Sequence, residues 1–192
     1  MLVNKNKIYR LAAIIIGVVC FLNLSVFADE PVIVNVDNFV RAETAFQFDR
    51  TLALINGEVN TFVHIREPIP LDKQTVIRMN RDTYYSAAIV DISKGATLTI
   101  PETHGRYVSA MIINEDHFIN NVYHNPGTYH LTMEEFGTPY VNITFRILVD
   151  ALDPEDVKKV WAIQDGITIK AESAIPYTHP NYDEESYEAT YK

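Results

Sequence analysis

The chain has 192 residues, with 25 acidic and 16 basic side chains and a formal net charge of −9. This acidic balance lacks the large basic surface that attracts nucleic acids and anionic membranes, so we expect neither as a partner. With a single cysteine, Cys20, the sequence predicts a domain that is held together by its core rather than by disulfides.

The N-terminus has the layout of a secretory signal peptide. Lys5, Lys7 and Arg10 precede an apolar run from residue 11 to residue 24, and Ala28 is a small residue before a plausible cleavage point. The run is shorter than the roughly 20 residues that a membrane-spanning helix needs. We therefore predict a signal peptide over residues 1–28 and a periplasmic or secreted protein with no membrane segment after cleavage. Retention of this segment as an anchor is the alternative.

The first elements after the signal peptide are a helix and an irregular loop. Apolar residues at spacings of three and four predict a helix from Asp37, its cap, to Ile55, and Asn56-Gly57 ends it. Two prolines in the segment His64–Pro70 then predict an ordered loop without regular structure.

Most of the remaining chain has the pattern of strands. After a strand that begins at Arg78, the predicted strands are Thr97–Ile100, Arg106–Phe118, Thr128–Met133 and Tyr140–Val149. The second of these is apolar on both faces between Val108 and Ile113, which predicts that both of its faces are covered. Short strands separated by turn residues predict a mainly β fold, an antiparallel sandwich over residues 29–171 with a helix at each end.

The end of the chain contains a second predicted helix and a tail. Asp153 fits a helix cap and Pro154 the first helical position, and the helical pattern continues to Lys170. Residues 172–192 are acidic, rich in tyrosine and interrupted by proline, which favours a mobile tail. The near-helical spacing of the tyrosines leaves a stripe that faces a partner as the alternative.

The most polar predicted strand is Arg78–Ser86. Its period of two places a guanidinium, an amide, a carboxylate, a phenol and a hydroxyl on one face; these belong to Arg78, Asn80, Asp82, Tyr84 and Ser86. One interpretation is a pocket in which Arg78 binds a small polar or anionic ligand and Tyr84 donates a hydrogen bond. The other is a structural network in which Arg78 or Arg81 pairs with a carboxylate, and it is favoured because buried polar groups usually satisfy one another.

A second polar cluster is Glu115-Asp116-His117, which we expect near the first. Histidine spacing typical of metal sites is absent, so we assign no metal. His117 with Asp116 or Asp82 could act as a base, but Ser86 lies outside any nucleophile motif, so catalytic residues and cofactors stay unassigned. The candidate ligand-binding residues are Arg78, Asn80, Arg81, Asp82, Tyr84, Glu115, Asp116 and His117.

Four segments, taken in order, resemble the domain of unknown function 1254 family. They are His64–Pro68, Thr75–Ser86, Ile113–His117 and Asn125–Tyr129. The resemblance implies an exported bacterial protein with a β-sandwich, jelly-roll-like core and no settled activity. Members often continue into a β-rich domain of unknown function 1214. We therefore expect a separate polypeptide of that type as partner, docked with the help of Trp161 and the tyrosine tail.

The expected function is that of an exported binding or assembly module with a polar, ligand-facing or partner-facing strand. The alternative is a hydrolase or metal-dependent enzyme that uses the same polar residues, completed by a second domain in trans.

Overall fold

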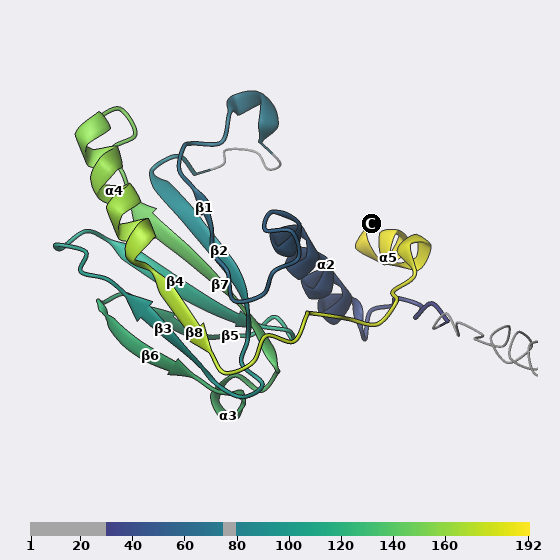
Figure 1. The fold of residues 1–192 in the computed structure, drawn as a ribbon. Coiled ribbons are helices and arrows are strands. Elements are labelled where there is room, and N and C mark those ends of the chain that lie inside the picture. Colours follow the sequence, from purple (N-terminus) through teal and green to yellow (C-terminus); the bar gives the residue numbers. More distant parts are fainter. Residues whose placement is uncertain (1–29, 75–79) are drawn as a thin grey trace, which may run out of the picture. The chain divides into compact units, whose positions relative to one another are not determined.

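The computed structural model describes residues 30–74 and 80–192, and the predicted signal peptide and Arg78 lie outside these ranges. The chain divides into two units, residues 1–31 and 32–192, and the second contains the described elements (Figure 1). None of its described helices is long and apolar enough to cross a membrane.

The mainly β fold is confirmed, because the described elements include eight strands in two antiparallel sheets. The larger sheet has the order β1 (Val63–Ile65), β2 (Thr83–Asp91), β7 (Tyr140–Leu148), β4 (Val108–Asn114) and β5 (Ile119–Tyr123). The smaller sheet has the order β6 (Gly127–Leu131), β3 (Ala96–Ile100) and β8 (Thr168–Ala171). The inward side chains of both sheets form one core, in which Leu98, Ile143 and Phe145 are completely buried.

The helix α4 (Pro154–Gly166) completes this core, with Val160 fully buried in it. Its predicted start is confirmed: Asp153 accepts a hydrogen bond from the Glu155 amide, and Pro154 occupies the first turn. The predicted extension to Lys170 is wrong. The chain leaves the helix after Gly166 and pairs as β8 with β3, because Ile169 and Ala171 alternate towards the core as strand residues do.

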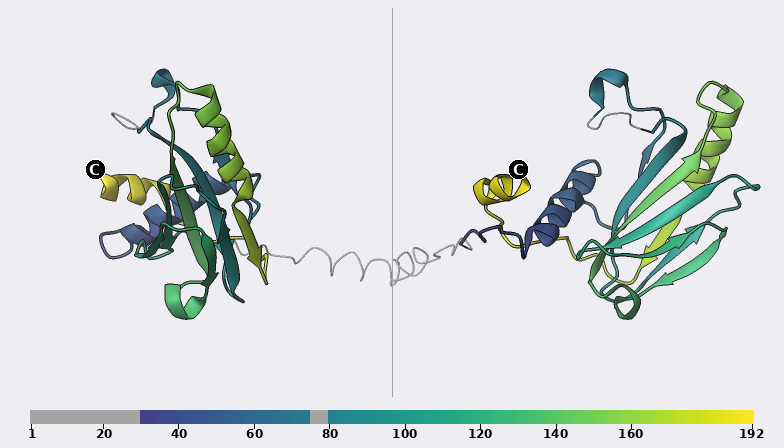
Figure 2. Two further views of the ribbon diagram at one scale, coloured as in Figure 1. Left: turned by 90° about the vertical axis from the view of Figure 1, so that its left-hand side faces the viewer. Right: turned by 180° about the vertical axis from the view of Figure 1, so that it is seen from behind.

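The helix α2 (Phe39–Ala53) confirms the N-terminal prediction and lies on the outer face of the larger sheet. Phe48 and Leu52 pack against Ile89 and Tyr140 in a second apolar cluster. Figure 2 shows the C-terminal helix α5 (Glu184–Tyr191) beside α2.

The prediction of a mobile tail is wrong. Tyr182 and Tyr187 are buried against Ala42 and Ala45, on the side of α2 that the sheet leaves open. Asp183 caps α5 by accepting a hydrogen bond from the Ser186 amide. The acidic composition that favoured disorder belongs to the exposed side of a short amphipathic helix.

Two strand boundaries and one loop also differ from prediction. The strand predicted from Arg78 begins at Thr83, and the strand predicted to run to Phe118 ends at Asn114. There the Asn114 side chain accepts hydrogen bonds from the Asp116 and Phe118 amides and turns the chain. His64 and Ile65, the first two residues of the predicted loop, belong to β1 and pair with β2. The remaining elements are the 3-10 turn η2 (Leu71–Lys73) and the short helix α3 (Met133–Phe136).

Candidate functional site

The residues predicted to begin the polar strand form a surface turn. Asn80, Arg81 and Asp82 are exposed. The Asn80 side chain accepts a hydrogen bond of 2.7 Å from the Asp82 amide, and the Arg81 guanidinium donates one of 2.9 Å to the carbonyl of Ile69. These contacts are local, and Arg78 lies outside the described residues. This turn therefore contains no buried ionic network among the residues described.

The face predicted to be polar is the face of β2 that enters the core. Tyr84 is 3% exposed among apolar side chains, and burial raises the pKa of its phenol. The period of two was correct, but this face of β2 also carries Ala88 and Val90 and packs into the core between the two sheets.

A hydrogen-bonded group at Ser86 joins α4 to the larger sheet. The Ser86 hydroxyl lies 2.8 Å from His64 Nδ1 and accepts a hydrogen bond of 3.2 Å from Gln164 Nε2. Gln164 Nε2 also lies 3.1 Å from the Tyr85 carbonyl. Burial, and then the charge of Arg66, lower the pKa of His64. Ser86 and Gln164 are completely buried, so this group positions α4 and is closed to a substrate.

The cluster Glu115-Asp116-His117 forms a separate group under α2. Glu115 is 7% exposed, accepts a hydrogen bond from the Tyr140 amide at 3.2 Å and pairs with Arg41, which also binds Asp116. His117 Nδ1 lies 2.9 Å from the Thr44 hydroxyl. Burial raises the pKa of Glu115, and Arg41 opposes the shift. The cluster therefore fixes α2 to the β4–β5 turn.

The two predicted groups lie at opposite ends of the larger sheet. Thr83, beside the surface turn, pairs with Leu148, whereas Tyr140, beside Glu115, pairs with Asp91. The nine-residue length of β2 separates them. The expectation that they are neighbours is wrong, because a strand carries its two ends apart by about 3.3 Å per residue.

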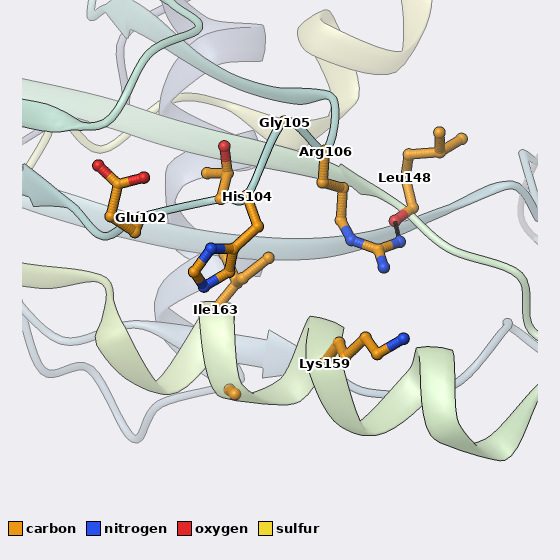
Figure 3. A pocket seen from close by; sticks show the side chains of 9 residues that line it. Glu102, His104, Gly105, Arg106, Leu148, Lys159 and Ile163 are labelled. Atoms are coloured by element: carbon orange, nitrogen blue, oxygen red, sulfur yellow. Dashed lines mark hydrogen bonds between the residues drawn. The ribbon is translucent and has the colours of Figure 1, made fainter.

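A cavity of about 750 Å³ opens between α4 and the loop that joins β3 to β4 (Figure 3). It is lined by Glu102, Thr103, His104, Gly105, Arg106, Leu148, Lys159, Ala162 and Ile163. In Figure 3 the ring of His104 points from the loop towards α4, and Lys159 lies on α4 below Arg106.

The loop is shaped by two residues with positive φ. His104 has a φ of 52° and Gly105 a φ of 78°, and the Arg106 amide donates a 3.0 Å hydrogen bond to the carbonyl of Thr103. At the other end of α4, Gly166 lies directly against Pro101, where a Cβ would come within 2.8 Å of the proline ring. This close approach fixes the distance between helix and loop.

Arg106 and Asp156 connect the loop to the first turn of α4. The guanidinium donates two hydrogen bonds to the Asp156 carboxylate and one of 2.7 Å to the carbonyl of Leu148. The hydrogen bond from Arg106 lowers the pKa of Asp156 to about 2. Arg106 therefore holds the loop against α4.

Lys159 is the cation of the cavity whose side chain makes no hydrogen bond in the described part of the chain, although its charge acts on Asp156 one turn earlier in α4. In the described part of the chain no hydrogen bond or close ion pair engages its ammonium group, whereas the neighbouring Lys158 donates to Glu155 at 2.7 Å. Ala162 and Ile163 give the helix side of the cavity an apolar wall. The described residues contain no group of three or more histidine, cysteine or carboxylate side chains arranged to hold a metal ion. The arrangement suits an anion with an apolar body.

A family model described as a protein of unknown function, DUF1254, matches residues 59–171. This chain belongs to the DUF1254 family. The matched range contains all eight described strands, α4 and the cavity, whereas α2 and α5 lie outside it.

One solved structure with a similar fold is the VPA0106 protein from Vibrio parahaemolyticus, with a TM-score of 0.58 and 17% sequence identity. The match covers 77% of this chain and 41% of that chain, so this chain spans about two fifths of that structure. No curated protein sequence matches this chain.

Sequence reasoning missed the cavity. The Asp153 cap was predicted from the sequence, and it places the start of α4 correctly. This local pattern does not give the distance between Lys159 and the β3–β4 loop, because the packing of elements that are far apart in the sequence determines it.

Proposed function

We propose that this DUF1254 protein is an exported binding module that holds a small anionic molecule in the cavity between α4 and the β3–β4 loop. The observation that carries this proposal is the Lys159 ammonium group, which lies at the cavity with no hydrogen-bond partner in the described ranges. A carboxylate would supply that partner through a charge-assisted hydrogen bond. The volume of about 750 Å³ lies within the range of small-molecule sites.

The ligand class follows from the two sides of the cavity. A carboxylate would meet Lys159, while an apolar body would lie against Ala162 and Ile163. The described lining residues include no hydroxyl or thiol hydrogen-bonded to a histidine or carboxylate, which supports binding rather than nucleophilic catalysis.

Benzoate is a suitable probe, with the uncharged benzyl alcohol as its matched analogue. We expect calorimetry to show that benzoate binds and that Lys159→Gln weakens it roughly tenfold, the loss of one charge-assisted hydrogen bond. Lys158→Gln removes the same charge one residue away and should leave the affinity unchanged. Equal affinity in both variants, or equal binding of benzyl alcohol, would contradict the proposal.

We also propose a periplasmic or secreted location and assembly with a separate polypeptide of the unknown-function 1214 type. The sequence layout of residues 1–28 and the family resemblance support these proposals. The exported protein should begin at Asp29 by mass spectrometry, and the two polypeptides should elute together from a sizing column after co-expression. Separate elution would contradict the proposal that the two polypeptides form a complex.

A further inference from the structure

Among the described residues, α2 covers only one half of the outer face of the larger sheet. Beneath α2, Ile89 is completely buried and Asn142 is 8% exposed. Two and four residues further along β7, Thr144 is half-buried and Arg146 is exposed on the same face. Beyond them Leu148 is 45% exposed, with its side chain directed away from α4 (Figure 3).

The open half carries apolar side chains from three strands. Met111 on β4 lies opposite Val122 on β5, and Ala87 on β2 lies on the other side of β7, since Ala87 and Met111 both pair with Thr144. Val63 on β1, opposite Ala87, packs instead against the apolar cluster beneath α2. The register shift between β4 and β5 places Ile119 on the same face as Val122, and these two are 55% and 38% exposed. The prediction that both faces of the Val108–Ile113 segment are covered therefore holds for the inner face and only in part for the outer one. Tyr85, Ala87 and Met111 are half-buried, and a partly exposed apolar surface that spans several strands is typical of an interaction site.

Arg146 lies in the middle of this surface. Its guanidinium carbon is 5.6 Å from the centroid of the Tyr85 ring, and the described residues offer it neither a hydrogen bond nor an ion pair. The strand residues of the open half that face outwards include no carboxylate, although the chain has 25 acidic residues. The surface therefore combines apolar area with one unpaired cation stacked on an aromatic ring.

We infer that this open half, which we define by Tyr85, Ala87, Met111, Val122, Thr144 and Arg146, docks a separate polypeptide that presents an apolar surface with a carboxylate to Arg146. Charge complementarity selects this occupant over a second copy. A two-fold pairing of the same face would bring two Arg146 side chains into one interface without a carboxylate between them. The inference rests on the proposed partner and names where that partner binds.

The test measures the affinity of the 1214-type polypeptide for the purified protein by calorimetry. Arg146→Glu replaces the cation by a like charge, and Val122→Asp places a carboxylate in the apolar area. Each should weaken binding by roughly thirtyfold or more, as loss of a buried interfacial charge pair does. Leu152→Asp is the matched control, because Leu152 is 94% exposed in a turn outside the sheet, and it should leave the affinity unchanged.

The possible outcomes distinguish failure of the proposed docking surface from failure of the proposed partner. Tight binding by the wild type that Arg146→Glu and Val122→Asp do not weaken would overturn the docking surface and leave the partner in place. Absence of binding by the wild type would overturn both. A wild-type homodimer in sedimentation that Arg146→Glu dissociates would overturn the choice of a separate polypeptide. Circular dichroism of each variant establishes that it is folded, as expected for exposed side chains.

Discussion

The Asp82 side chain contributes little to the fold, whereas its backbone amide and carbonyl are both hydrogen-bonded. The Asp82 amide donates to the Asn80 side chain, and its carbonyl accepts a 2.9 Å hydrogen bond from the Val149 amide. Both contacts continue the sheet into the turn that precedes β2. The side chain is exposed and makes no ion pair with any residue in the described ranges.

We therefore expect Asp82→Asn to change the free energy of unfolding by less than about 0.5 kcal/mol, as is usual at such surface positions. Asn80→Ala should cost about 1 kcal/mol, because it removes the acceptor of the Asp82 amide. Urea unfolding of the two variants measures both values. A loss near 3 kcal/mol for Asp82→Asn would instead indicate the buried ionic network that the sequence favoured.

Tyr84 shows how far single residues can be assigned from sequence. The alternation along β2 correctly places Tyr84 and Ser86 on one face. The alternation could not show that this face enters the core, because a tyrosine and a serine are compatible both with a core-facing position and with a ligand-facing one. Contacts from Gln164, 78 residues away from Ser86, decide the question.

At the scale of elements, the ends of α4 differ in how predictable they are. The cap at Asp153 is a local signal, and it was sufficient to predict where α4 begins. The end at Gly166 depends on Pro101 and on pairing with β3, which lie more than 60 residues earlier in the chain. The same limit applies to the cavity, whose two sides come from these distant segments.

The ion pair between Arg106 and Asp156 predicts a specific dependence of stability on pH. The folded state holds the pKa of Asp156 at about 2, below the ordinary value of about 3.9 expected in the unfolded chain. The stabilisation is therefore complete above about pH 4 and is lost as the pH falls towards 2, because the unfolded state binds the proton first.

Urea unfolding of the wild type and of Asp156→Asn at several pH values between 5 and 2 tests this dependence. The difference in free energy of unfolding should be largest at pH 5 and smallest near pH 2. A difference that stays constant across this range would show that the carboxylate of Asp156 does not stabilise the folded state through its charge.

At the scale of the whole molecule, the helices at the two ends of the described chain form their own small core. Tyr187 is 7% exposed, stacks on Phe39 at 5.7 Å and contacts Phe46 edge-on at 4.6 Å. Its hydroxyl donates to Glu43, and burial together with this hydrogen bond raises its pKa to about 12. This cluster is separate from the core between the two sheets.

We expect Tyr187→Ala to release the C-terminal segment while leaving the sandwich folded. Hydrogen exchange should become faster in residues 182–191 and stay unchanged in β2 and β7, because the two cores share no buried residue. Tyr191→Ala is a matched control, since Tyr191 is 64% exposed. Equal acceleration in β7 would contradict the separation of the two cores.

The contact between α2 and α5 also has a consequence for the order in which the chain is made. A ribosome synthesises α2 first among the described elements and α5 last, more than 130 residues later. Until the final residues emerge, Phe39 and Phe46 have no Tyr187 to cover them, although β2 and β7 can already pair. The apolar side of the first helix is thus the part of a nascent chain that waits longest for its partner, and it is where a holding chaperone would find an exposed aromatic surface.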